Sequence, residues 1–252
     1  MLNKNFYVNE NGASIHCKIY YNDLKKLNSI VLYGHGFGGH KDNKAAERFA
    51  VKATSKHKNS GVVTFNLPCH GDDVRKTLIL SDCNDYIKLV LEHIKTKLGV
   101  KNIYGYATSF GGYLYLKYIA ENGNPFKKLV LRCPAINMYG VINSSIMSDS
   151  DRKLLAHNKP VSVGFDKKIK INSQFLKDLK NSDINKYDYS DYCDDILIMH
   201  GTKDEIVPIE ASAEFAENNF LEFAAVENAD HRFTDPLIMD NTIRDILNFL
   251  NL

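Results

Sequence analysis

Between a short apolar run and a helical pattern lies the stretch Tyr106-Ala107-Thr108-Ser109-Phe110-Gly111-Gly112. This arrangement predicts a sharp turn between a strand and a helix, which exposes the serine hydroxyl at the carboxyl end of a sheet. Small residues are needed two positions either side of Ser109, because the strand and the helix nearly touch there. The stretch is a close variant of G-x-S-x-G with alanine for the first glycine, and it makes Ser109 the candidate nucleophile.

Apolar runs alternate with amphipathic stretches along most of the 252 residues. The expected strands cover residues 6–8, 15–21, 30–33, 62–67, 102–107, 128–131, 196–199 and 221–226. The expected helices cover residues 44–57, 83–98, 111–121, 209–218 and 237–250. Strands separated by helices of this length need right-handed crossovers, which predicts an α/β fold with a mainly parallel sheet and helices on both faces.

The alternation stops between Pro134 and Asp195. Roughly 60 residues without a clear core strand are too many for a structureless loop in a compact domain. Inside this interval, residues 149–157 and 173–180 have the pattern of short amphipathic helices, and residues 161–165 that of a strand. We therefore expect a single domain over residues 1–252, with a small cap inserted at about 134–194 over the active-site end.

Composition argues against several classes of protein. The 32 basic and 30 acidic residues are spread along the chain without a basic block, so nucleic acid is not an expected partner. No apolar run approaches the roughly 18 residues of a membrane span, and the N-terminus lacks the apolar core of a signal peptide. The five scattered cysteines signal neither a disulfide framework nor a zinc site. We expect a cytoplasmic protein, while secretion of a trimmed product and assembly as a homodimer stay open.

A serine hydroxyl becomes a strong nucleophile only beside a base, and that base needs a third group to orient it. In the predicted architecture the acid and the histidine follow the serine in chain order. Asp204 and His231 each follow a predicted strand, so both lie at the same sheet edge as Ser109. Each residue alone is more typical of a turn or a solvated loop. The ordered set predicts a catalytic triad, with Glu205 as the alternative acid.

Acyl transfer also needs donors for the developing oxyanion. The backbone N–H groups of Phe110 and of Phe37, in the loop Gly34-His35-Gly36-Phe37-Gly38-Gly39, are the candidates. His35 itself is expected to be a structural hydrogen-bonding residue. The same loop matches G-x-G-x-x-G, but the next strand ends in Asn66-Leu67-Pro68, without the acid that would hold a ribose. A dinucleotide site is therefore not expected.

A second cluster of polar residues is Cys69-His70-Gly71-Asp72-Asp73. Adjacent ligands rarely point at one ion, and no second cluster has the usual spacing. A tight turn with solvated acids is the preferred interpretation, and we expect neither a metal nor another cofactor.

The motifs together resemble the α/β-hydrolase fold over nearly the whole chain. More narrowly, four of them resemble bacterial cinnamoyl (feruloyl) esterases: His35-Gly36-Phe37-Gly38-Gly39, Pro68-Cys69-His70-Gly71, His200-Gly201-Thr202-Lys203-Asp204 with Val207-Pro208, and Ala229-Asp230-His231-Arg232-Phe233. The resemblance implies a serine carboxylesterase that acts on esters of small organic acids, with hydroxycinnamate esters among them. The inserted segment is similar to the small cap of those enzymes.

The chain departs from that family around the serine. The family's turn usually reads G-H-S-x-G-G, often with glutamine after the serine, where this chain has Ala107, Thr108 and Phe110. We expect Phe110 to narrow the mouth of the acyl site or to make it more apolar. The cap residues that either line an apolar pocket or form the cap's own packing are Met138, Tyr139, Met147 and Phe165.

Three alternatives remain open at the level of sequence. A thioesterase or a peptidase-like enzyme would use the same triad. A ligand-binding protein that retains the fold without catalysis is the alternative from a different class.

Overall fold

The computed structural model describes residues 1–165 and 167–252, and eight of its strands form one sheet. In chain order these strands are β1 (Leu2–Glu10), β2 (Ala13–Tyr21), β3 (Ser29–Gly34), β4 (Ser60–Phe65), β5 (Asn102–Thr108), β6 (Leu129–Arg132), β9 (Ile196–Gly201) and β10 (Glu222–Val226). Their order across the sheet is β1-β2-β4-β3-β5-β6-β9-β10. Across the sheet, every pair from β4 through β3, β5, β6 and β9 to β10 is parallel. Only the pairs β1–β2 and β2–β4 are antiparallel. The predicted α/β class with a mainly parallel sheet is confirmed.

The first two strands form a hairpin around Asn11 and Gly12, both of which have positive φ angles (51° and 76°). Turns of this kind favour asparagine followed by glycine, because both central residues must adopt left-handed backbone conformations. The first strand is longer than residues 6–8, which the apolar pattern indicated.

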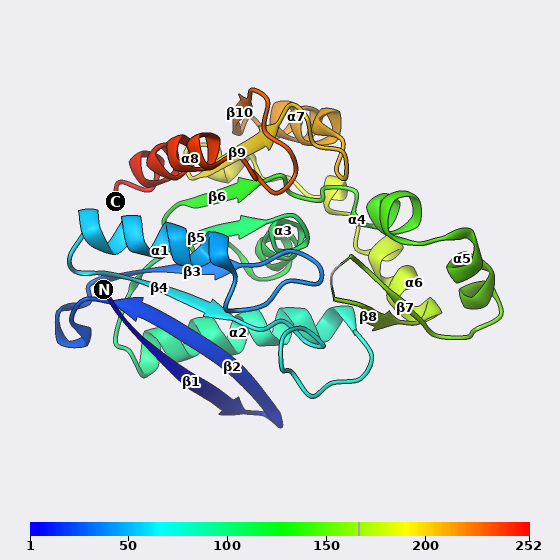
Figure 1. Cartoon of the computed structure of the whole chain (residues 1–252), viewed down its shortest axis with the longest axis horizontal. Helices are drawn as coiled ribbons and strands as arrows, with labels where there is room; N and C mark the ends of the chain where they lie inside the picture. Colours follow the sequence, from blue (N-terminus) through cyan, green and yellow to red (C-terminus); the bar gives the residue numbers. More distant parts are fainter. Residues whose placement is uncertain (166) are drawn as a thin grey trace.

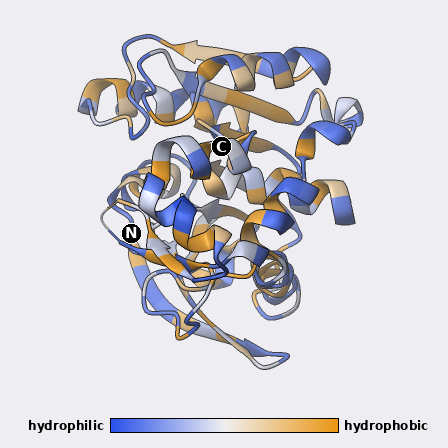
Figure 2. Cartoon of the chain, turned by 90° about the vertical axis from the view of Figure 1, so that its right-hand side faces the viewer, coloured by the Kyte–Doolittle hydropathy of each residue, from blue (hydrophilic) through white to orange (hydrophobic). Residues whose placement is uncertain are grey.

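Helices cover both faces of the sheet. Every residue of β3, β4, β6 and β9 is buried, which explains why these strands have continuous apolar sequences instead of alternating ones. One face packs against α1 (Lys44–Lys56) and α8 (Pro236–Phe249). The other packs against α2 (Leu80–Thr96), α3 (Phe110–Asn122) and α7 (Ile209–Asn218). In Figure 2 the helices alternate between hydrophilic and hydrophobic colours, as expected for helices with one buried side.

The segment between β6 and β9 has its own small elements. They are α4 (Met138–Val141), a π-helical turn (Ile142–Ile146), α5 (Asp149–Ala156), the antiparallel pair β7 (Val161–Val163) and β8 (Ile169–Ile171), and α6 (Ser173–Asn181). Figure 1 shows them beyond the arrowheads of β3 to β6, at the carboxyl ends of the parallel strands. That the chain forms one domain with a cap at about 134–194 stays a prediction.

Two boundaries near the site differ from the sequence patterns. β4 ends at Phe65, and β9 continues through His200 to Gly201 instead of ending at Met199. His200 is therefore a buried strand residue and not part of the following loop. None of the helices in the described parts of the chain combines the length and the apolarity that a membrane crossing requires.

Candidate active site

Ser109 forms the turn between β5 and α3. Its backbone angles, φ 52° and ψ −119°, are rarely adopted by a residue that carries a Cβ atom. The turn is fixed on both sides, because the Ser109 N–H donates to the Arg132 carbonyl (3.0 Å) and the Ser109 carbonyl accepts from the Ala135 N–H (3.1 Å). The serine remains partly exposed while the residues on either side are buried. The backbone thus presents the hydroxyl at the carboxyl edge of the sheet.

The chain around this turn is packed too closely for larger side chains. A Cβ atom built on Gly111 would lie 2.6 Å from the Gly34 carbonyl oxygen and 2.7 Å from that of His35. Ala107 can take the place of the motif's first glycine because it faces Gly34, which has no side chain. A Cβ atom built on Gly34 would lie 3.1 Å from the Ala107 Cβ. The strand opposite therefore supplies the space that the alanine needs.

The loop after β3 runs beside the serine. A Cβ atom on Gly36 would lie 3.2 Å from the Ser109 Cβ and 3.7 Å from its Oγ. Phe110 is the first residue of α3, so its N–H has no partner within the helix. Among the described residues, no hydrogen bond engages the N–H of Phe110 or of Phe37. Both predicted oxyanion donors are therefore available.

His35 holds this loop in place. Its Nε2 accepts a hydrogen bond from the Leu67 N–H (3.2 Å), so the proton lies on Nδ1, which donates to the Gly36 carbonyl (2.9 Å). Burial, together with the neighbouring His70, lowers the pKa of His35 to about 3. The ring is thus neutral and structural, as the sequence analysis expected.

The Phe110 side chain does not line the mouth of the site. It is fully buried, and its ring centroid lies 5.7 Å from that of Phe37, 6.4 Å from that of His70 and 6.2 Å from that of Tyr113. The expectation that Phe110 would narrow the mouth is therefore wrong. Its side chain supports the loop from below because α3 turns it towards the core.

The four residues predicted to belong to the cap divide into two pairs. Met138 and Met147 are buried in the main hydrophobic core, whereas Tyr139 and Phe165 are exposed. The Phe165 ring lies 5.9 Å from the guanidinium carbon of Arg232, the residue after His231. Of the four, only the exposed pair is available to contact a bound molecule.

The tip of the β7–β8 hairpin touches the loop that carries Phe37. A Cβ atom on Gly38 would lie 3.1 Å from the Lys167 carbonyl oxygen, and one on Gly164 would lie 3.5 Å from a Phe37 ring carbon. The Lys167 ammonium group also donates to the Gly71 carbonyl. The inserted segment is therefore in direct contact with the loops that surround the serine.

Asp204 and His231 meet across two neighbouring loops. The Nδ1 atom of His231 lies 2.7 Å from the Oδ2 atom of Asp204. The other carboxylate oxygen accepts from the N–H groups of Ile206 (2.9 Å) and Val207 (2.8 Å). Glu205 is exposed, so Asp204 is the acid that contacts the histidine.

Asp204 is ionised despite its burial. Burial alone would raise the pKa of this carboxyl, but hydrogen bonds from His200 and His231, the charge of His231 and the Val207 N–H hold it well below its usual range. The Asp204 side chain has no exposed surface, while that of His231 is 11% exposed. The Nε2 atom of His231 is thus the nitrogen left to face the solvent side of the site.

Ser109 and His231 follow strands in the same half of the sheet, separated by β6 and β9. Within the described residues, no hydrogen bond joins the Ser109 Oγ to His231. Such bonds are often long before a substrate binds and shorten in the complex. The structure therefore brings together Asp204 with His231, and Ser109 with the Phe37 loop.

One group of possible metal ligands occurs among the described residues, and it includes the acid. Atoms of Cys133, His200 and Asp204 lie within 4.8 Å of one another. Burial, followed by the charge of Asp204, raises the pKa of the Cys133 thiol, which is therefore neutral. The sequence motif contained His200, but its pattern carried no signal that the ring contacts Asp204 four residues later.

The Cys69-to-Asp73 stretch is a hydrogen-bonded turn. One Asp73 carboxylate oxygen accepts from the N–H groups of Cys69 (2.8 Å) and Arg75 (3.0 Å). Asp72 pairs instead with the His16 ring on β2 (2.6 Å). The two carboxylates therefore serve different contacts.

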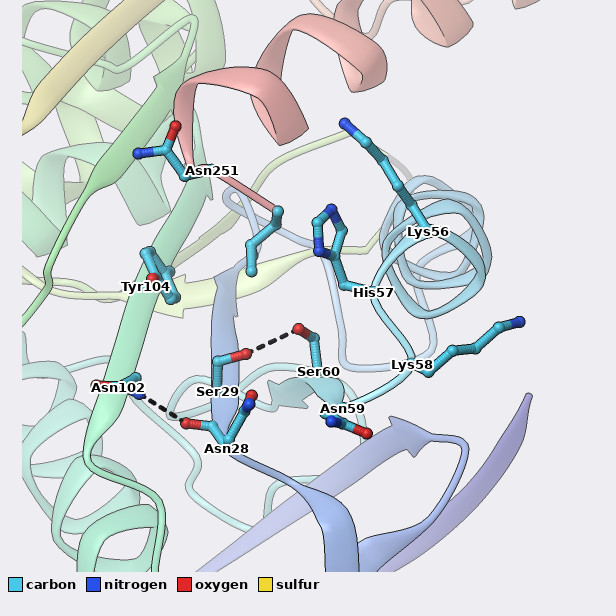
Figure 3. A pocket seen from close by; sticks show the side chains of 11 residues that line it. Asn28, Ser29, Lys56, His57, Lys58, Asn59, Ser60, Asn102, Tyr104 and Asn251 are labelled. Carbon is cyan, nitrogen blue, oxygen red and sulfur yellow. Dashed lines mark hydrogen bonds between the residues drawn. The ribbon is translucent and has the colours of Figure 1, made fainter.

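A polar hollow of about 430 Å³ lies at the opposite end of the sheet (Figure 3). It is formed where β3, β4 and β5 begin, and its floor includes the hydrogen-bonded pair Ser29 and Ser60 (2.7 Å) and the side chain of Asn102. None of the predicted site residues lines it. The hollow is therefore separate from the serine turn.

Comparisons with known proteins agree with the geometry. The prolyl oligopeptidase family matches residues 71–251, well over half of the chain. No curated protein matches the chain by sequence. Among solved structures, the ferulic acid complex of Est1E from Butyrivibrio proteoclasticus superposes with a TM-score of 0.78 at 17% identity, covering 98% of this chain and 100% of that chain.

A soluble variant of monoglyceride lipase from Saccharomyces cerevisiae, bound to a substrate analogue, superposes with a TM-score of 0.75 at 15% identity. The match covers 100% of this chain and 96% of that chain. At these identities the structural likenesses establish the fold, and the family match establishes the class of enzyme. The chain is a serine hydrolase of the α/β-hydrolase fold and belongs to the prolyl oligopeptidase family.

Proposed function

We propose that the protein is a serine carboxylesterase that hydrolyses esters of small organic acids. The observation that carries this proposal is the 2.7 Å contact between His231 and Asp204, at the same sheet edge as the strained Ser109 turn. A histidine oriented by a buried carboxylate is the base that a serine nucleophile requires.

The reaction proceeds through an acyl-enzyme. His231 Nε2 takes the proton from Ser109 as the serine oxygen attacks the ester carbonyl. The N–H groups of Phe37 and Phe110 donate to the oxyanion that forms. His231 then gives the proton to the leaving alcohol, and the acyl group remains on the serine. A water molecule, deprotonated by His231, attacks the acyl carbon; the bond to the serine oxygen breaks, His231 returns the proton to Ser109, and the organic acid leaves.

Asp204 stays ionised throughout. Its two remaining hydrogen bonds from backbone N–H groups keep it from rotating, and its charge stabilises the imidazolium form of His231. No cofactor takes part in this proposal.

We propose that the acyl group is a small or aromatic acid, with hydroxycinnamates as the first to test. The fold likeness to the ferulic acid complex of Est1E and the exposed aromatic rings of Tyr139 and Phe165 support this choice. A cytoplasmic location is proposed because the five cysteines are unpaired and four of them are buried.

The test compares the parent protein with Ser109→Ala on p-nitrophenyl acetate, p-nitrophenyl butyrate and methyl ferulate. We expect the variant to keep its circular dichroism spectrum and to lose hydrolysis and labelling by a fluorophosphonate probe. An alanine variant as active as the parent would refute the assignment. A parent protein that the probe does not label would favour the non-catalytic, ligand-binding alternative.

A peptidase with the same triad is the second candidate, because the family match is to prolyl oligopeptidases. Aminoacyl anilides and acyl thioesters belong in the same panel of substrates. The ratio of kcat/KM values between esters and anilides decides between the two candidates, and a preference for thioesters would identify a thioesterase.

A further inference from the structure

His200 shares a carboxylate oxygen with the histidine of the triad. It is fully buried on β9, and its Nε2 lies 3.0 Å from the Oδ2 atom of Asp204. This is the oxygen that His231 Nδ1 approaches to 2.7 Å. The His200 Nε2 also lies 3.1 Å from the Val207 carbonyl, and its Nδ1 lies 2.9 Å from the Ser212 hydroxyl.

The partners of His200 determine where its proton lies. A carboxylate and a backbone carbonyl only accept hydrogen bonds, so the Nε2 atom carries hydrogen and donates. In the neutral ring, Nδ1 then accepts from the Ser212 hydroxyl. Ser212, on α7, thereby selects the tautomer in which His200 donates to Asp204.

The Asp204 carboxylate is fully occupied as a result. His231 donates to Oδ2, and the His200 Nε2–H is shared between Oδ2 and the Val207 carbonyl. The N–H groups of Ile206 and Val207 donate to Oδ1, and the Cys133 thiol also hydrogen-bonds to the carboxylate. The donors therefore cover the approximately four acceptor sites of the carboxylate. The group has no free site into which it can turn, and part of its charge is drawn away from His231.

We propose that His200 is a positioning residue that orients Asp204 and limits how strongly His231 holds its proton. The inference rests on the proposed triad. Because the two rings compete for one oxygen, the Asp204 charge stabilises the His231 imidazolium less than an unshared carboxylate would.

Other groups around the pair are unchanged by a substitution at position 200. Cys133, the residue after β6, faces Asp204 as a neutral thiol and hydrogen-bonds to it. Asp230 and Arg232 flank His231 on its own loop, and the buried Arg132 acts on Asp230 from the end of β6. A change in the pH profile of a His200 variant is therefore assigned to the shared oxygen.

Two amide variants separate the role in catalysis from the role in packing. His200→Gln places its side-chain amide nitrogen near the position of Nε2, so it can still donate to Asp204. His200→Asn has a shorter side chain, whose amide nitrogen corresponds to Nδ1, so it keeps the Ser212 side and loses the donor to Asp204. The measurement is kcat/KM against pH with p-nitrophenyl acetate, normalised to the fraction of fluorophosphonate-titratable sites.

We expect the acid limb of the His200→Asn profile to move to higher pH by roughly half a unit to one unit. We also expect kcat to fall about tenfold, since Asp204 is less well oriented. His200→Gln should restore the parent limb. A His200→Asn protein with lower activity and a lower Tm, but an unmoved limb, would show that His200 is only structural and would overturn the proposal.

Ser212→Ala keeps the inference testable if His200→Asn does not fold. It removes the hydroxyl that selects the tautomer, so a smaller upward shift of the limb is expected, and no shift would overturn the proposal. Ser109→Ala separates this inference from the proposed function. An active Ser109→Ala protein refutes the triad itself. If Ser109→Ala is inactive but the acid limbs of the His200→Asn and Ser212→Ala profiles do not move, only the role of His200 is refuted.

Discussion

Replacing Ser109 with glycine should make the protein more stable while it abolishes activity. The backbone at this position, φ 52° and ψ −119°, costs a residue with a Cβ atom about 1–3 kcal/mol. Glycine avoids that strain but loses about 0.5–1 kcal/mol through the greater freedom of its unfolded chain. The net gain is about 1 kcal/mol, which raises the Tm of a domain of this size by about 2–4 °C.

Calorimetry and urea unfolding of Ser109→Gly, Ser109→Ala and the parent measure this gain. The alanine variant is the matched control, because it lacks the hydroxyl but keeps the Cβ atom and therefore the strain. We expect its Tm to stay close to that of the parent. If the glycine variant melts no higher than the alanine variant, the turn stores no strain and the reasoning fails.

Three further outcomes follow from the site. Gly111→Ala forces a Cβ atom to within 2.7 Å of two carbonyl oxygens; we expect a loss of about 1–3 kcal/mol in urea unfolding and a fall in kcat/KM. Gly99→Ala, where a Cβ atom meets open space at φ +69°, should lower stability without changing kcat/KM in the same assay. Asp204→Asn should lower kcat for ester hydrolysis about 10³- to 10⁴-fold, because the amide favours the wrong tautomer of His231, and Glu205→Gln should leave it unchanged. The folded pKa of Asp204 lies below its unfolded value, so its charge stabilises the fold above the ordinary carboxyl range, and this stabilisation is lost as the pH falls from that range towards the folded pKa. The unfolding free energy of Asp204→Asn should therefore fall less steeply in acid than that of the parent.

The fold was largely predictable because its strands and helices are long enough to show their periodicity. The α7 helix has the predicted bounds, and the strand that leads into the serine turn differs by one residue. In the insert, α5, α6 and β7 lie close to the residues predicted for them, whereas α4, the π-helical turn and β8 were not predicted. β8 has three residues, of which the outer two are buried, and so brief a pattern cannot be distinguished from a loop.

The order of the site residues along the chain was predictable, but the directions of their side chains were not. The register of a strand decides which face each residue occupies, and a sequence pattern leaves that register open by a residue or two. β9 runs two residues further than its apolar run, which carries His200 into the interior. The same kind of uncertainty applied to Phe110, whose ring lies in the core instead of at the mouth.

The contact between the β7–β8 hairpin and the Phe37 loop limits how this enzyme can be re-engineered. Cap segments are attractive to exchange when substrate range is to be altered, on the assumption that the chemistry beneath them is independent. Here the Gly38 backbone lies against the Lys167 backbone of the hairpin, and the Gly164 backbone of the hairpin lies against the Phe37 ring. A transplanted segment must therefore bring a hairpin tip of the same shape, or the loop that carries Phe37, the proposed oxyanion donor, loses this support.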